Sequence, residues 1–139
     1  SRYFLGGIIS YADAVKTRLL GVPQETLRSH GAVSEEVARA MAAGACAALA
    51  SDWAISITGI AGPAGGSASK PVGLVYVGLK TPTEVRVNEF RLGEQTPRDV
   101  IRERAARCAL NLLRVALLER TKADTPNPQQ GSNHPAKPV

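Results

Sequence analysis

The stretch over residues 52–80, DWAISITGIAGPAGGSASKPVGLVYVGLK, decides the fold. An apolar run over residues 53–57 predicts a buried strand, and a second run over residues 72–79 predicts the next one. The loop between them is rich in glycine, proline and serine, which end strands and make turns. Because glycine has no side chain, such a loop can bring backbone N–H groups close to an anion. A plain hairpin connection explains the same composition, and the loop has neither a GxGxxG nor a P-loop pattern.

The sequence before this stretch predicts one strand followed by helices. Residues 3–11 predict the strand, and residues 12–20 predict a short helix that ends at Gly21. A second, shorter helical turn follows. Ser34 suits the N-cap of a third helix, because two glutamates follow it in the first turn and a stripe of apolar side chains recurs behind it.

The sequence after the stretch predicts a third strand and a long helix. Residues 84–91 alternate in polarity and should form an antiparallel hairpin with the run before them. The alternation shifts near Asn88, so we expect a bulge or a change of face there. Residues 96–120 predict the helix. This order of elements predicts an α/β fold: a three-layer α/β/α sandwich with a mixed, mostly parallel sheet containing one antiparallel hairpin strand.

Composition divides the 139 residues into one domain and a tail. Residues 1–120 form the expected domain. Residues 121–139 hold four prolines and few apolar side chains, which predicts a disordered tail. No apolar run approaches the roughly 20 residues of a membrane span, so we expect no membrane partner. Cys46 and Cys108 lie in alanine-rich helical patterns, which favours reduced thiols over a disulfide and so a cytoplasmic location.

The net charge of +5 permits a nucleic-acid partner without requiring one. The arginines are spread along helices between glutamates, and aromatic side chains that could stack on bases make up only 4% of the chain. A solvated helix face therefore explains the charge better than a nucleic-acid site, and attraction to anionic small molecules fits equally well. The small side chains of the helices favour association between copies, so we expect a homo-oligomer.

Tyr11 and Lys16 are the candidate catalytic residues. Tyr11 ends the first expected strand, and Lys16 follows in the opening turns of a helix. An electropositive helix N-terminus and partial burial both disfavour the protonated amine. A neutral lysine can act as a general base for a hydroxyl nucleophile, and a phenol can relay a proton. A surface lysine beside a strand-end aromatic explains the same residues without any chemistry, so the pattern alone leaves both interpretations open.

Several motifs together resemble the CinA C-terminal domain family, the nicotinamide-nucleotide amidases linked by name to competence and DNA damage. SYADAVKTRLLGV at 10–22 is similar to the family's SYSNEAKxxLLGV. HGAVSEEVARAMAAG at 30–44 is similar to its HGAVSExVAxAMAxG helix. TGIAGPAGG at 58–66, followed by KPVGLVYVGL at 70–79, is similar to its glycine loop and next strand. The resemblance extends over about residues 3–118.

The resemblance implies hydrolysis of the carboxamide of nicotinamide mononucleotide (NMN) to nicotinate mononucleotide and ammonia, in pyridine nucleotide salvage. It implies no metal and no other cofactor. Lys16 would be the base that activates a serine, with Tyr11 as its partner. The glycine loop would cradle the substrate and supply N–H donors, and one arginine of an Arg-x-x-x-Arg pair would bind the phosphate. The implied substrate-binding residues are Thr58, Gly59, Ile60, Ala61, Gly62, Pro63, Gly65, Gly66, Arg98 and Arg102.

The sequence departs from the family pattern in three places. The family's serine lies in a Ser-Cys-Thr-Gly-Gly stretch upstream of the Tyr-Lys segment, and residues 1–139 contain no such stretch. We therefore expect these residues to begin inside a domain, to have little or no amidase activity, and to lack a strand that would otherwise cover a sheet edge. Asp13 replaces an asparagine near the lysine, and Thr96-Pro97 replaces a Gly-Asp pair. The alternative is a non-catalytic ligand-binding or assembly module of the same fold.

Overall fold

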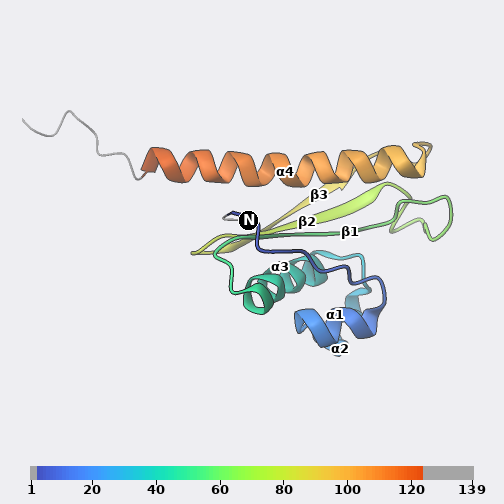
Figure 1. The fold of residues 1–139 in the computed structure, drawn as a ribbon. Coiled ribbons are helices and arrows are strands. Elements are labelled where there is room, and N and C mark those ends of the chain that lie inside the picture. Colours follow the sequence, from blue (N-terminus) through green and yellow to red (C-terminus); the bar gives the residue numbers. More distant parts are fainter. Residues whose placement is uncertain (1–2, 124–139) are drawn as a thin grey trace, which may run out of the picture.

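The computed structural model describes residues 3–123, which form a three-stranded sheet with helices on both of its faces (Figure 1). Helix α4 lies along one face, and the three shorter helices lie on the other. The elements in chain order are α1 (Asp13–Leu20), α2 (Gln24–His30), α3 (Glu35–Leu49), β1 (Ala54–Gly59), β2 (Leu74–Lys80), β3 (Val85–Arg91) and α4 (Arg98–Ala123).

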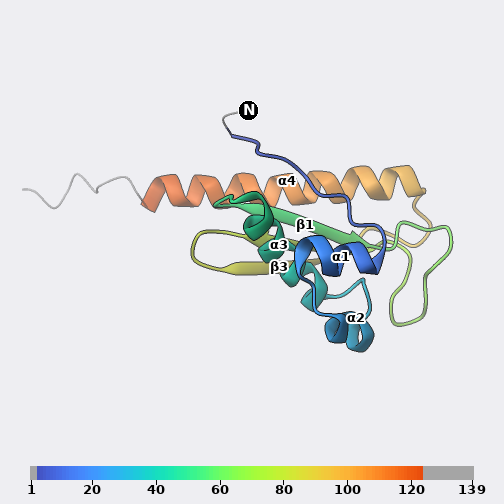
Figure 2. The ribbon, with the colours of Figure 1, turned by 60° about the horizontal axis from the view of Figure 1, so that its bottom comes forward.

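The sheet has the order β1-β2-β3, and both pairs of neighbours are antiparallel. The expectation of a mixed, mostly parallel sheet is therefore wrong for the described residues. The expected parallel pairs all involved residues 3–11, which are extended beside β1 but contain no strand (Figure 2). Because β1 and β2 are joined by a loop without a crossover helix, β2 returns along β1 in the opposite direction.

The hairpin of β2 and β3 is confirmed, and its register is continuous from Leu74 opposite Arg91 to Lys80 opposite Val85. There is no bulge between these residues. The shift in polarity is instead a change of face, because Phe90 packs in the apolar cluster beneath α4. Val87, by contrast, lies opposite Gly78, whose α-carbon faces the backbone of α3.

Two apolar clusters hold the layers together. One joins the three N-terminal helices and consists of Leu20, Val22, Leu27, Val37 and Met41. The other joins the sheet to α4 and consists of Val75, Val77, Ile101, Ala105 and Ala109. Their side chains are at most 9% exposed, so burial of apolar area on both faces is the main stabilising contribution.

The helix ends follow the expected signals. Ser34 caps α3, since its hydroxyl oxygen accepts a hydrogen bond from the Val37 N–H at 3.3 Å. Gly21 ends α1 with a φ of 63°, the left-handed conformation that glycine adopts without strain. Helix α4 continues to Ala123, so residues 121–123 are helical and not part of a tail. The rest of the expected tail lies outside the described residues.

Two further expectations concern the cysteines and the membrane. Cys46 is buried, Cys108 is half-buried, and both are free thiols, as expected. Within residues 3–123, no helix has the length and apolar character needed to cross a bilayer.

Candidate functional site

The amine of Lys16 is buried near the start of α1, and this side chain is the centre of the candidate site. The residue is only 6% exposed. Its Nζ donates one hydrogen bond to the carbonyl oxygen of Tyr11 at 3.0 Å and one to Oδ1 of Asp13 at 3.2 Å. The Asp13 side chain is 60% exposed, so solvent screens this ion pair and its contribution to stability is small. The two acceptors therefore orient the amine more than they stabilise the fold.

Tyr11 contacts Lys16 through its backbone and not through its phenol. The residue is 92% exposed, which places the ring in solvent. A carbonyl acceptor at this position is available whatever side chain is attached. The contact therefore supports a role for residue 11 in orienting the amine, and it gives the phenol no part in that hydrogen bond.

Lys16 lines a groove of about 950 Å³ that lies between residues 3–11 and β1. We call it the N-terminal groove. Its lining residues on the helices are Lys16 and Leu20 of α1, Met41, Ala45 and Leu49 of α3, and Leu110, Leu113 and Leu117 of α4. Ser56 of β1 also lines it, but its hydroxyl is buried and donates to the Ala38 carbonyl at 2.6 Å. This hydroxyl is thus engaged in joining β1 to α3.

The glycine-rich loop between β1 and β2 is fastened to its surroundings at several points. Lys70 reaches out of the loop, and its Nζ donates to the carbonyl oxygens of His30, the last residue of α2, and of Val33, which lies between α2 and α3. Arg98 reaches the loop from the first turn of α4, and its Nη1 donates to the Gly62 carbonyl at 2.9 Å. These contacts join the loop to the helices on both faces of the sheet.

Two glycines of the loop are required by its own packing. A Cβ on Gly62 would lie 2.7 Å from a methyl carbon of Val72, and one on Gly66 would lie 2.9 Å from the Val72 backbone nitrogen. Gly62 also has a φ of 72°. The sequence predicted glycines that let a ligand approach, whereas these two let the loop fold over Val72.

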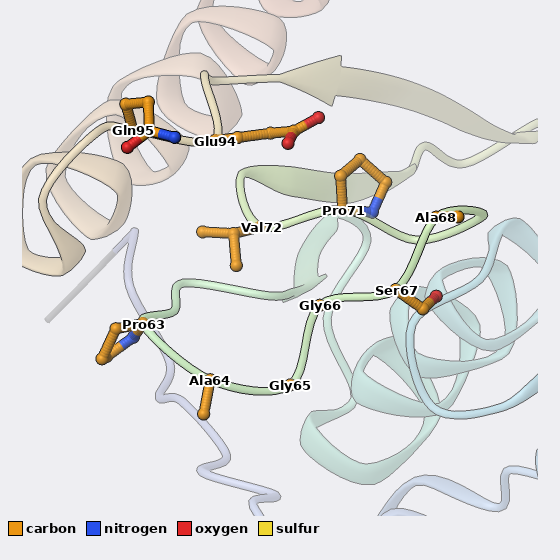
Figure 3. A pocket seen from close by; sticks show the side chains of 10 residues that line it. All are labelled: Pro63, Ala64, Gly65, Gly66, Ser67, Ala68, Pro71, Val72, Glu94 and Gln95. Carbon is orange, nitrogen blue, oxygen red and sulfur yellow. The ribbon is translucent and has the colours of Figure 1, made fainter.

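The loop borders a shallow hollow of about 510 Å³, which is separate from the N-terminal groove (Figure 3). Pro63, Gly65 and Gly66 are the implied substrate residues that line it. Glu94 and Gln95 lie on the rim opposite the loop. The Glu94 carboxylate makes this hollow unfavourable for a phosphate, because like charges repel.

The remaining implied substrate residues lie apart from both cavities. The Thr58 hydroxyl is buried and donates to the Ala32 carbonyl at 2.7 Å. The backbone of Gly59 lies against Leu74 and Val75 of β2. The Ile60 backbone pairs with Leu74 and Gly73, Ala61 packs under α4, and Arg102 is exposed one turn after Arg98. Lys16 and the glycine loop therefore do not line a common cavity in this structure.

Sequence reasoning missed the residues that give the groove its apolar character. Leu110, Leu113 and Leu117 recur at helical spacing on α4, so their common face was visible in the sequence. Lys70 was also missed, because nothing local predicts which carbonyls a lysine will reach. Within residues 3–123, no three histidine, cysteine or acidic side chains gather in a way that could hold a metal ion.

Comparisons with known proteins agree with the geometry of the fold. The family model of the CinA C-terminal domain matches residues 1–117. A CinA-like protein of Gloeobacter violaceus is 54% identical over 114 residues, which cover 82% of this chain and 27% of that protein. A CinA-like protein of Gloeothece citriformis is 55% identical over 119 residues, which cover 85% of this chain and 28% of that protein. The chain thus spans less than a third of the length of these relatives.

Solved structures match the same region. A competence/damage inducible protein from Agrobacterium tumefaciens superimposes with a TM-score of 0.73 at 43% identity, over 76% of this chain and 64% of that one. A competence-damaged protein (CinA) superfamily member from Escherichia coli superimposes with a TM-score of 0.71 at 32% identity, over 75% of this chain and 59% of that one. Both likenesses are in sequence as well as in fold.

Proposed function

Because this chain belongs to the CinA C-terminal domain family, we propose that residues 1–120 form part of an amidase that converts NMN into nicotinate mononucleotide and ammonia. The observation that carries the proposal is the buried, oriented amine of Lys16 at the N-terminal groove. Lysines are almost never this buried unless they are paired. The partner carboxylate is largely in solvent, so pairing alone is a weak reason for the burial.

In the proposed reaction, the amine of Lys16 acts as the general base and accepts the proton of a serine hydroxyl as the serine oxygen attacks the carboxamide carbon. The C–N bond then breaks, and the lysine returns the proton to the departing ammonia. Water hydrolyses the resulting ester and releases nicotinate mononucleotide. By the family resemblance, the serine belongs to sequence upstream of the Tyr-Lys segment, beyond the residues described.

Other residues of this chain would orient the amine and bind the substrate phosphate. The Tyr11 carbonyl and the Asp13 carboxylate orient the amine. We assign the phosphate to Arg102, because the neighbouring Arg98 is already engaged with the loop.

The test compares the 139-residue chain with the same chain extended at its N-terminus by the Ser-Cys-Thr-Gly-Gly stretch of a family member and the residues that join it to the Tyr-Lys segment. Both are incubated with NMN, and ammonia and nicotinate mononucleotide are measured. We expect little or no product from the first protein and turnover from the second. In the second protein, Lys16→Met should lower kcat by at least about 100-fold, as loss of a general base does. Lys122→Met, at the exposed end of α4, is the control and should leave kcat unchanged.

Two outcomes would count against the proposal. If the extended protein binds NMN without hydrolysing it, the domain is a binding module. If Lys16→Met retains the full rate, the lysine is not the base, whatever the reaction.

A further inference from the structure

Strand β3 forms the edge of the sheet on the side away from residues 3–11, and within residues 3–123 no strand pairs with its outer side (Figure 2). Its ladder with β2 shows which of its backbone groups face outward. The N–H of Leu92, just after the strand, donates to the carbonyl oxygen of Gly73. Because the register is continuous, the even-numbered residues of β3 also bond to β2. The N–H and C=O groups that face away from the sheet are those of Val85, Val87, Glu89 and Arg91.

Helix α3 covers the start of this edge. Nη1 of Arg39 donates a hydrogen bond of 2.5 Å to the carbonyl oxygen of Val85, one of the outward-facing groups. The guanidinium of Arg39 is held there by a second contact, because its Nη2 lies 2.7 Å from Oε1 of Glu35, one helical turn earlier. The part of the edge that is left for another strand therefore begins at residue 87.

The side chains on this part of the edge carry charges of both signs. Glu89 and Arg91 lie two residues apart on the same face of β3, where Nε of Arg91 is 2.8 Å from Oε1 of Glu89. Charged side chains on an edge strand commonly prevent pairing with other chains. Opposite charges placed directly across from each other stabilise a pair of strands, whereas like charges destabilise it. This edge therefore selects a strand that has the opposite charges in the opposite order.

A second copy of β3 meets this requirement. A two-fold axis through the sheet makes the two strands antiparallel and places one residue opposite itself. With that residue at Phe90, Glu89 of each copy lies opposite Arg91 of the other. With it at Glu89 or at Arg91, like charges lie opposite each other. With it at Val87 or at Asn88, neither charge lies opposite its counterpart, so only the register centred on Phe90 matches the charges of this part of the edge.

One further register would match charges elsewhere on the strand. A pairing centred on Val85 would place Glu84 of each copy opposite Arg86 of the other. That pairing needs the carbonyl group of Val85, which already accepts the hydrogen bond from Arg39. Helix α3 thus removes this register and leaves the one centred on Phe90.

The register centred on Phe90 pairs residues 87–93 of the two copies. It also places the two Phe90 rings opposite each other on the α4 side of the sheet, where Phe90 already packs against the apolar cluster. A cross-strand pair of aromatic side chains contributes to the stability of two paired strands. Backbone, charge and aromatic contacts therefore agree on the same register.

We propose that β3 pairs with β3 of a second copy of this chain, antiparallel about Phe90, so that the two sheets become one continuous sheet. Hydrogen bonds between the outward-facing backbone groups join the two strands. Exposed ion pairs add little affinity, so the contacts between Glu89 and Arg91 act mainly by selecting the partner and the register. The surface is a strand edge and not the small-residue helix faces from which the sequence predicts association. The inference does not depend on amidase activity.

Two other occupants of this edge fit less well. Strand β1 of a second copy has no charged side chain that could match Glu89 and Arg91, and residues 3–11 lie beside its outer side. The chain's own residues 124–139 contain four prolines, which lack the N–H groups that a pairing strand must donate.

The test measures association of the full 139-residue chain by sedimentation and amide exchange at low and high protein concentration. We expect dimers to form as the concentration rises, with slower exchange at residues 87, 89 and 91. Glu89→Arg and Arg91→Glu each place like charges opposite each other, so each should weaken association at least tenfold. Mixed in equal amounts, the two variants again place arginine opposite glutamate and should form a heterodimer. One chain that carries both changes keeps the charges matched and should dimerise like the wild type.

Glu84→Arg is the matched control. Glu84 also forms an ion pair with the arginine two residues after it, Arg86, but it lies outside residues 87–93. This change should leave association unchanged, and unfolding followed by circular dichroism checks that every variant is folded. A chain that stays monomeric up to about 1 mM would overturn the proposal. So would a failure of both the mixture and the double variant to restore association, a loss of association in Glu84→Arg, or a dimer that protects β1 and not β3.

Discussion

Nη1 of Arg98 donates a hydrogen bond of 2.9 Å to the carbonyl oxygen of Gly62, which joins the first turn of α4 to the glycine-rich loop. The loop thereby depends on a helix that lies on the opposite face of the sheet from α3. The family resemblance offers Arg98 as one of two possible phosphate ligands. Its position explains it first as a residue that holds the loop in place.

Arg98→Met should therefore loosen the loop. A hydrogen bond from a charged donor contributes about 1.5–3 kcal/mol when it is well shielded, and less in this half-exposed setting. We expect amide exchange over residues 62–67 to become about tenfold faster, a change that corresponds to about 1.4 kcal/mol. Arg102→Met is the control and should leave these rates unchanged. Equal acceleration in both variants would show that charge on α4, and not this contact, protects the loop.

Gly44→Ala should destabilise the protein, although it places a better helix former inside α3. By helix propensity alone the change would stabilise by about 1 kcal/mol. In the structure, however, a Cβ on Gly44 would lie 1.8 Å from the Leu20 carbonyl oxygen, where α1 ends. Because a backbone atom cannot move aside cheaply, we expect a loss of about 1–3 kcal/mol in the free energy of unfolding. Urea denaturation measures it, and a gain in stability would refute the close approach of the two helices.

Ala50→Gly should stabilise the protein. Ala50 ends α3 with a φ of 48° and a ψ of 44°, a left-handed conformation that costs an L-residue roughly 1–2 kcal/mol. Glycine relieves that cost but is more flexible in the unfolded chain, so we expect a net gain of about 0.5–1 kcal/mol. Gly21→Ala, at the corresponding position after α1, should do the opposite. Thermal and urea unfolding of the two variants should shift in opposite directions, and a shift in the same direction would contradict the assignment.

Tyr76 should make stability fall at alkaline pH. Burial, and then the hydrogen bond that its hydroxyl donates to Glu89, raise the pKa of Tyr76 above its usual value near 10. Because the pKa is higher in the folded state than in the unfolded state, the stability that the Tyr76 hydroxyl contributes is complete below about pH 10. It is lost as pH rises through the unfolded-state value toward the folded one. Tyr76→Phe should remove this part of the pH dependence.

The control for Tyr76 is Tyr11→Phe, because that residue is exposed. Urea unfolding between pH 8 and pH 11 compares the three proteins. The wild type and Tyr11→Phe should lose stability more steeply than Tyr76→Phe. Identical slopes for all three would show that the Tyr76 hydroxyl is not specially protected in the folded state.

Local signals predicted the helices well. Ser34 was recognised as a cap from its side chain and the glutamates after it, and Gly21 from its place at the end of an apolar pattern. The hairpin of β2 and β3 was likewise visible in its short turn. Each of these features depends on interactions between residues that are close in the sequence, so a short stretch of sequence is enough to predict it.

The errors concern features that depend on distant neighbours. Residues 3–11 have the composition of a strand, but a strand also needs a neighbour to pair with, and the described sheet ends at β1. The burial of Lys16 was expected, whereas its acceptor, the Tyr11 carbonyl, was not, because side-chain patterns say nothing about free backbone groups. The packing of Gly62 and Gly66 against Val72 was not visible in the sequence either, because it exists only once the loop is folded.

Through Lys70, one side chain of the glycine-rich loop itself holds the loop against the N-terminal helices. Its half-buried side chain joins the loop to the carbonyl group of His30, at the end of α2, and to that of Val33, in the segment that leads to α3. Acetylation of this amine would remove its charge and leave it a single N–H donor, so at most one of the two hydrogen bonds could remain. The loop would then depend on its remaining contacts, such as the hydrogen bond from Arg98 to the Gly62 carbonyl, to keep its position.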